Sequence, residues 1–310
     1  MHRRAAPPPD LVRTATRQCG LVDLAQCHDA GLSDKEVRGL VARAGLRRVT
    51  RGVLELTAAA PDRADLPARR RRTAWLAMLA FGPDSVAVGP CALALHRVEG
   101  LPLTIRPEAA LPRASNRRHR DGLLLRQFDD GMDVVEVDGR RTVSVEWALA
   151  QAVPELPREY GLAVLDSVLH RRLLDRAGLE RAHEAARGRR GVATRHDLWE
   201  LADHRAESPL ESFARLECVE DGIGPHTLQL PLLGRDETVL GRGDLAWRRR
   251  DGRWLVAELD GADVHGTPRA VYADRRRQNL FTGTGAVHLL RFTGRDRGHI
   301  ATTVRRALAA

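Results

Sequence analysis

The chain has 310 residues, 43% of them hydrophobic, which is enough to build the cores of two or three domains. It contains no run of about 18 apolar residues, and residues 1–10 lack the apolar core of a signal peptide, so we expect neither a membrane partner nor secretion. Four scattered cysteines form no CxxC pair. This pattern excludes a disulfide framework and a zinc site, and it predicts a reducing, cytoplasmic setting.

The formal net charge of +9 favours contact with a polyanion such as DNA. Lys35 is the only lysine among the 50 basic residues, and such an arginine bias is typical of a GC-rich genome. Charge alone therefore leaves nucleic-acid binding and a solvated basic surface as open alternatives.

Residues 1–9 are expected to be a tail, and residues 10–57 a small domain. Glycines and apolar stripes predict helices near residues 11–19, 21–30 and 33–44. Ser33 and Glu36 form a capping box that starts the third helix. Residues 46–56 alternate loosely around a glycine, as a hairpin does.

Three short helices and a hairpin are the layout of a winged helix-turn-helix, whose third helix enters the major groove while the wing contacts the backbone. A solvated basic face or a protein-contact module is the alternative. If the domain binds DNA, the exposed basic side chains of the third helix and the wing become the candidate DNA-binding residues: Lys35, Arg38, Arg43, Arg47, Arg48 and Arg51.

Residues 58–144 are expected to form a small α/β middle domain. Its predicted helices are near residues 67–81 and 91–98, and its predicted strands are near residues 86–88, 103–105, 123–128 and 134–137. The basic loop at residues 112–120 either contacts phosphate or is solvated. Residues 145–205 are expected to be a helical connector without recognisable chemistry.

Residues 206–310 are expected to form an α/β domain that starts with a helix capped by Ser208 and Glu211. Strands near residues 227–231, 241–248, 254–260 and 286–292 follow, with helices near 270–281 and 300–308, and Asp244 lies near the start of the second strand. Within the third strand, Glu258 and Asp260 share one face. Two carboxylates on one face need a hydrated edge, an arginine or a metal ion.

The acids on three successive elements have a chemical logic. Phosphodiester cleavage needs a hard divalent cation, and Glu211 on a helix with Asp244 and Glu258 on adjacent strands can hold one without closing its coordination sphere. The alternative is a structural ion network in which Glu258 and Asp260 pair with Arg276 or Arg277.

The last hundred residues contain four short motifs in order: Gly243–Trp247, Val256–Gly261 with His265 after it, Tyr272–Leu280 and Leu289–Thr293. In this order they resemble the Vsr-like domain of unknown function in the PD-(D/E)XK nuclease superfamily. The N-terminal stretch at residues 45–52 resembles the winged-helix domain of AbiEi-type antitoxins. Residues 133–139 are similar to a segment of actinobacterial proteins that join these two domains.

The resemblance implies a multidomain α/β protein with an N-terminal winged helix-turn-helix and a C-terminal restriction-endonuclease-like domain. It implies that Asp244 and Glu258 bind Mg²⁺ or Mn²⁺ and that Glu211 is the helix acid. Asp260 stands where many relatives have the catalytic lysine. The resemblance further implies water activation or leaving-group protonation by His265, and roles for Asp274 and Arg277 in orienting the site and binding phosphate.

Two functions follow from this pattern. The first is a metal-dependent DNA endonuclease, and the second is an antitoxin-like transcriptional repressor of a type IV toxin–antitoxin system. In the second, the partner is a cognate toxin protein and the nuclease-fold domain is inactive. The lysine missing at Asp260 keeps both alternatives open.

Overall fold

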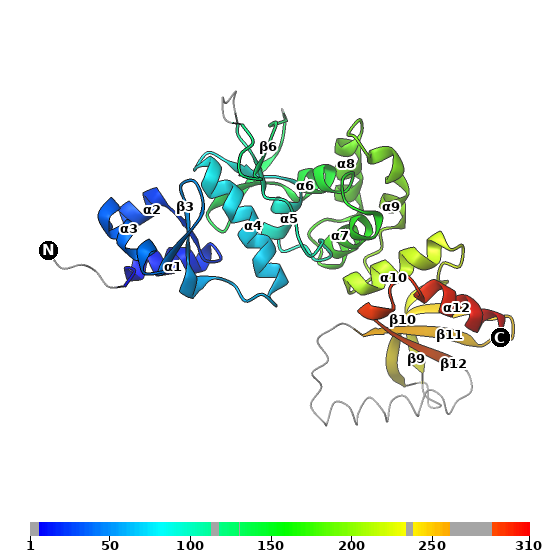
Figure 1. The fold of residues 1–310 in the computed structure, drawn as a ribbon. Helices are drawn as coiled ribbons and strands as arrows, with labels where there is room; N and C mark the ends of the chain where they lie inside the picture. Colours follow the sequence, from blue (N-terminus) through cyan, green and yellow to red (C-terminus); the bar gives the residue numbers. More distant parts are fainter. Residues whose placement is uncertain (1–5, 113–117, 130, 234–237, 261–286) are drawn as a thin grey trace. The chain divides into compact units, whose positions relative to one another are not determined.

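The computed structural model describes residues 6–112, 118–129, 131–233, 238–260 and 287–310 (Figure 1). It confirms a mixed α/β protein, and the described strands form sheets of three, five and four strands. The chain divides into two compact units, the first comprising Met1–Glu155 and Arg176–Thr194 and the second Leu156–Asp175 and Arg195–Ala310. No helix in these described ranges combines the length and the apolar character needed to cross a bilayer.

The N-terminal part of the first unit has three short helices and a three-stranded antiparallel sheet of order β1-β3-β2. The predicted capping box of Ser33 and Glu36 is confirmed. The prediction of a helix over residues 21–30 was wrong in its first turn, because residues 21–23 pair with β3 and Asp23 then caps the helix that follows. The elements are α1 (Pro9–Arg17), β1 (Leu21–Asp23), α2 (Leu24–Asp29), α3 (Asp34–Ala42), β2 (Leu46–Thr50) and β3 (Val53–Leu56).

The rest of the first unit surrounds a five-stranded sheet of order β6-β5-β4-β8-β7. The strand expected at residues 103–105 was wrong, since the strand is β5 at residues 108–110, and β8 was not predicted. The reason is tertiary: Glu108 is 2% exposed and enters the sheet paired with Arg126 of β6. The elements are η1 (Thr57–Ala59), α4 (Leu66–Phe81), β4 (Val86–Ala87), α5 (Gly89–Leu95), β5 (Glu108–Ala110), β6 (Leu124–Arg126), β7 (Val134–Val137), β8 (Arg140–Val143), α6 (Val145–Ala152), α8 (Arg176–Ala186) and η2 (Val192–Thr194).

The helices expected to form one connector over residues 145–205 are divided between the units. Helices α6 and α8 belong to the first unit, whereas α7 (Arg158–His170) and α9 (His196–Leu201) belong to the second. In the second unit, Asp166 of α7 and Arg215 of α10 (Pro209–Glu220) form an ion pair at 2.7 Å, with side chains only 1% and 6% exposed. The hydroxyl of Ser212 also donates to Asp166 at 2.7 Å, so these contacts join α7 to α10.

The second unit is built on a sheet of order β12-β11-β10-β9, in which β9, β10 and β11 are antiparallel and β12 is parallel to β11. Asp244 lies in the middle of β10, which corrects its expected place near a strand start. The helix expected at residues 270–281 lies outside the described residues. The elements are β9 (Thr227–Leu233), β10 (Val239–Arg248), β11 (Trp254–Asp260), β12 (Val287–Thr293), η3 (Gly294–Asp296) and α12 (Ile300–Ala309).

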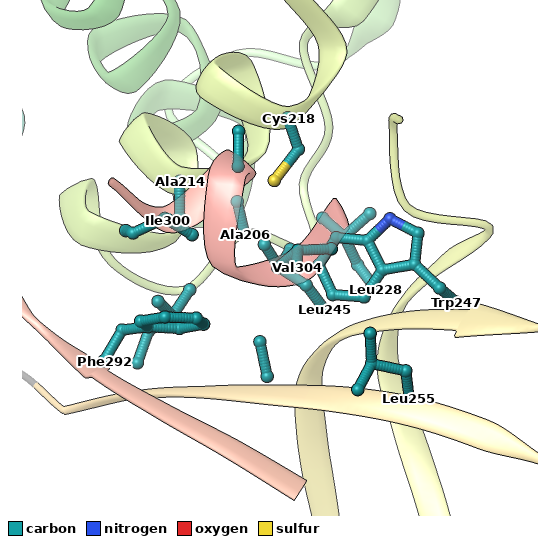
Figure 2. Packing of buried hydrophobic residues seen from close by; sticks show 13 residues of the cluster. Ala206, Ala214, Cys218, Leu228, Leu245, Trp247, Leu255, Phe292, Ile300 and Val304 are labelled. Atoms are coloured by element: carbon teal, nitrogen blue, oxygen red, sulfur yellow. The ribbon is translucent and has the colours of Figure 1, made fainter. Parts of the chain in front are cut away.

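One face of this sheet is covered by α10 and α12 (Figure 2). Leu245 and Leu255 from the strands pack there against Ile300 and Val304 of α12. Trp247 is buried on the same face, and its indole nitrogen donates to the carbonyl oxygen of Ile223 at 2.6 Å. This packing fixes α10 against the sheet, and Glu211, Asp244 and Glu258 lie on these elements.

Candidate functional site

The regular alternation of β9 is interrupted at Gln229. Leu228 packs with Leu245 in the helix-covered core, whereas Leu230, two residues later, packs with the apolar cluster on the opposite face. Gln229 between them has φ of 53°, in the left-handed region that non-glycine residues rarely adopt. Such strained positions persist where the surrounding structure holds them and are concentrated at functional sites.

The side chain of Gln229 connects two acids. Its amide nitrogen donates to Glu211 Oε2 at 2.9 Å, and the amide also hydrogen-bonds with Asp244. Glu211 lies in the first turn of α10, where Ser208 caps the helix, and its side chain is buried at 4% exposure. The backbone N–H of Glu207 donates to the same Oε2 at 3.0 Å. The helix cap and Gln229 together set the position of the Glu211 carboxylate.

The carboxylate of Asp244 takes a place in the sheet that a backbone group would otherwise fill. The β10–β11 register includes the pair Leu245–Ala257. Two residues farther along β11, the backbone N–H of Leu259 donates to Asp244 Oδ2 at 2.7 Å. Burial, and then the negative charges of Glu211 and Glu258, raise the pKa of Asp244 to about 7. Burial also raises the pKa of Glu211. These two carboxyl groups therefore hold a proton more readily than exposed carboxyl groups do.

We call Glu211, Asp244 and Glu258 the acidic cluster. Glu258 is half-buried on β11, and its Oε2 lies 2.8 Å from the guanidinium of Arg291 on β12. The two residues are level in the parallel register of β11 and β12. Glu258 thus has an arginine partner in Arg291, whereas Arg276 and Arg277, the partners expected for Glu258 and Asp260, lie outside the described residues.

The remaining predicted site residues fall in two groups. Asp260 is the last residue of β11, half-buried and level with Thr293 of β12. His265, Asp274 and Arg277 lie outside the described residues, so their relation to the acidic cluster stays a prediction.

The donor types of the acidic cluster suit a hard cation, because Mg²⁺ and Mn²⁺ prefer carboxylate oxygens. Within the described ranges, however, no three His, Cys, Asp or Glu side chains lie close enough together to hold a metal ion. One oxygen of each acid already has a partner: Gln229 on Glu211, Leu259 on Asp244 and Arg291 on Glu258. The carboxylate donors are of the type that such a cation prefers, but the three side chains would have to move closer together to bind it.

The predicted DNA-binding residues of the N-terminal part are all exposed, namely Lys35, Arg38, Arg43, Arg47, Arg48 and Arg51. Arg47 also has a structural partner, because its Nε donates to Glu55 Oε2 at 2.7 Å. Arg72 of α4 pairs with the other oxygen of Glu55 at 2.5 Å. The hairpin is thus joined to α4 through a shared glutamate.

Sequence reasoning missed Gln229 and Arg291 as members of the site. Gln229 sits in an ordinary apolar strand pattern, and nothing local marks its left-handed conformation. Arg291 lies inside one of the four motifs. The signal that could have identified it is its basic side chain on the strand that pairs in parallel with β11, level with Glu258.

No protein-family model matches the chain. Over 147 residues the chain is 34% identical to two proteins of Mycobacterium tuberculosis, Uncharacterized protein Rv2248 of strain H37Rv and Uncharacterized protein MT2308 of strain CDC 1551. The match covers 47% of this chain and 53% of each relative. The chain thus spans about half the length of the curated relatives it matches, and neither relative's name states an activity.

Proposed function

We propose that the protein binds DNA and hydrolyses its phosphodiester bonds with a divalent cation, Mg²⁺ or Mn²⁺, held by Asp244 and Glu258. The observation that carries this proposal is the convergence of acids from α10, β10 and β11 at a buried position, where burial and then the charges of Glu211 and Glu258 raise the pKa of Asp244 to about 7. A divalent cation held by these acids adds positive charge beside the carboxyl group of Asp244 and keeps that group ionised at neutral pH.

The proposal includes the finer fold assignments. The order of α10, three antiparallel strands, a parallel fourth strand and α12 is consistent with a PD-(D/E)XK, Vsr-like nuclease domain. The three helices and three-stranded sheet of the N-terminal part are consistent with a winged helix-turn-helix of the AbiEi type. The exposed basic residues of α3 and the hairpin then supply the DNA contacts.

The proposed division of roles follows from the contacts. A bound divalent cation activates water and offsets the charge that builds on the phosphate. Gln229 orients the carboxylates of Glu211 and Asp244, while Arg291 fixes the carboxylate of Glu258. His265 remains the proposed proton carrier for the water or the leaving group, and Arg277 the proposed phosphate contact.

The test is cleavage of duplex DNA by the full chain with Mg²⁺ or Mn²⁺, with and without EDTA. Asp244→Asn and Glu258→Gln are expected to reduce cleavage by more than the ~10–100-fold typical of outer partners of a metal ligand. Asp251→Asn is the matched control, since it removes one carboxylate from the exposed turn of the same domain. Undiminished cleavage by Asp244→Asn and Glu258→Gln would show that the acidic cluster is not the catalytic site.

A second candidate function is an antitoxin-like transcriptional repressor of a type IV toxin–antitoxin system, with a cognate toxin as partner and a catalytically inactive nuclease-fold domain. The ion pair between Glu258 and Arg291 favours it, because this pair balances one acid without a cation. Asp260 also favours it, because it stands where many PD-(D/E)XK nucleases have the catalytic lysine.

The repressor predicts sequence-specific binding to the DNA upstream of its own gene. Binding is expected to be unchanged in Glu258→Gln and lost in Arg38→Ala and Arg51→Ala, with no cleavage in either metal. EDTA-sensitive cleavage that depends on Asp244 would exclude this second function.

A further inference from the structure

A cleft of about 570 Å³ in the first unit combines an apolar wall with a basic rim. It lies among the β2–β3 turn, the start of α2, the end of α4 and the residues before β6. Leu24 and residues 79–83 form much of its wall. Arg51, Arg118 and Arg120 line it, and Asp23 is the one carboxylate among its described lining residues.

The residues before β6 are held against the hairpin by a tight turn. Arg120 and Leu123 form an antiparallel bridge, and Asp121 and Gly122 between them have φ of 51° and 75°. Positive φ at both central positions defines a type I′ turn, for which Asp-Gly is a preferred sequence. Thr50, at the end of β2, donates its hydroxyl to Asp121 Oδ2 at 2.7 Å. The tip of this turn is thus fastened to the hairpin.

The same turn is fastened on its other side to α4. The guanidinium of Arg120 donates to the carbonyl oxygen of Ala80 in the last turn of that helix. A cation at a helix C-terminus is favourable, because the unpaired carbonyl groups there carry partial negative charge. Arg120 therefore acts as an anchor, and it places Arg118, two residues earlier, at the rim of the cleft.

The positive charge of the rim has little compensation. Arg51 and Arg118 are exposed, and neither has a carboxylate partner in the part of the chain that the structure describes. Asp23 uses its carboxylate to cap α2, where it accepts the N–H of Gln26 at 2.8 Å. Arginine side chains in this arrangement suit phosphate oxygens. Arg48 on β2, in the same hairpin as Arg51, is also exposed.

We propose that this cleft binds a backbone phosphate of duplex DNA through Arg118 and Arg51, so that the DNA contact surface extends beyond residues 10–57 to the turn at residues 118–122. This inference rests on the proposed DNA-binding function. DNA is the occupant because the hairpin that carries Arg51 also carries the exposed Arg48, so it offers more positive charge than a single phosphate group needs. The Thr50–Asp121 bond sets the spacing of the two arginines.

The experiment measures the affinity of the full chain for labelled duplex DNA by fluorescence anisotropy over a series of salt concentrations. Arg118→Ala is expected to weaken binding several-fold and to lower the slope of log K against log[salt] by about 0.9, the value for one lost phosphate contact. Arg250→Ala is the matched control, because it removes an exposed arginine from the turn between β10 and β11. An effect of Arg118→Ala no larger than that of Arg250→Ala would overturn the proposal.

Two further variants test the fastening without removing a positive charge. Thr50→Val keeps the charge and the shape, and Asp121→Ala removes a negative charge, which by electrostatics alone would strengthen DNA binding. The proposal predicts that both weaken binding, because Arg118 is no longer held beside Arg51. Stronger binding by Asp121→Ala together with unchanged binding by Thr50→Val would overturn it. Melting temperatures confirm that the variants are folded.

The outcomes separate this inference from the function on which it rests. Weakened binding by Arg48→Ala, with Arg118→Ala and Thr50→Val unchanged, would leave DNA binding in place and reject the cleft. Failure of the unaltered chain to bind duplex DNA even at low salt would reject the DNA-binding function. Calorimetric binding of inorganic phosphate that requires Arg118, with DNA affinity unchanged in Arg118→Ala, would identify a small-anion site and reject the DNA contact.

Discussion

At the scale of single residues, burial raises the pKa of a carboxyl group in each of the two units. Asp244 is held near like charges, whereas Glu108 in the first unit is paired with Arg126 at 2.7 Å. Glu108 is 2% exposed, and its Oε1 has no hydrogen-bond partner among the described atoms. Burial raises the pKa of Glu108 to about 7 in spite of Arg126. This pKa makes the stability of the first unit dependent on pH.

The direction of that dependence follows from the proton affinities of the two states. The pKa of Glu108 is 4.5 in the unfolded chain and about 7 in the folded one, so the folded state binds the proton more tightly. Its contribution to stability is complete below pH 4.5 and is lost as the pH rises toward 7. Relative to Glu108→Gln, the native protein is expected to lose up to about 3 kcal/mol of unfolding free energy over this range. Urea unfolding of both proteins at several pH values measures the difference, and parallel pH profiles would contradict the prediction.

Arg291 is expected to compete with a cation for Glu258. Replacing it with glutamine removes a positive charge 2.8 Å from Glu258 Oε2. If Glu258 is a metal ligand, Arg291→Gln binds Mn²⁺ several-fold more tightly than the native protein does, as a calorimetric titration would measure. Arg253→Gln, which breaks an exposed pair with Asp251, is expected to leave Mn²⁺ affinity unchanged. Equal Mn²⁺ affinity in Arg291→Gln and the native protein would count against Glu258 as a ligand.

At the scale of elements, the contact between α7 and α10 depends on a buried ion pair. Asp166→Ala leaves Arg215 buried without its carboxylate, which typically costs about 3–5 kcal/mol of unfolding free energy. Asp197→Ala breaks an exposed pair with Arg158 in the same unit and is expected to cost at most ~1 kcal/mol. Chemical unfolding of the two variants compares these costs. Equal destabilisation would mean that Arg215 finds other partners when Asp166 is removed.

Element types followed local sequence signals where such signals exist. The capping box of Ser33 and Glu36 and the start of α10 at Ser208 were predicted from a few neighbouring residues, and both are confirmed. The strand Leu21–Asp23 was missed because its pairing partner is β3, some thirty residues later. Glu108 was missed for the same reason, since its place in a strand depends on Arg126.

At the scale of the whole molecule, the chain crosses between its two units three times, after Glu155, Asp175 and Thr194. The C-terminal domain expected at residues 206–310 is therefore not the whole of the second unit, which also contains α7 and α9. Each unit nevertheless has a core of its own, and the sheet of the second unit is covered by α10 and α12.

A fragment of residues 206–310 lacks Asp166 and exposes the side of α10 that carries Arg215. We expect this fragment to be less stable than the same region in the full chain, because a buried charge has lost its partner. A fragment of residues 156–310 retains α7 and is expected to unfold cooperatively. Circular dichroism during urea unfolding compares them. A cooperative transition of equal midpoint in both fragments would show that α7 is dispensable.

The sequence by itself determined the mixed α/β class, the basic residues of α3 and the hairpin that prove to be exposed, and the alternation that places Glu258 and Asp260 on one face of β11. These features depend on residue type and on spacing within a few positions. The winged-helix and nuclease assignments stay predictions. Only the tertiary structure decided that Gln229 bridges Glu211 and Asp244, that Arg291 pairs with Glu258, and that helices of the expected connector belong to different units. Gln229 and Glu211 lie 18 positions apart in the sequence, and Asp166 and Arg215 lie 49 positions apart. Patterns within a few neighbouring residues cannot show these contacts, which form only when folding brings distant segments together.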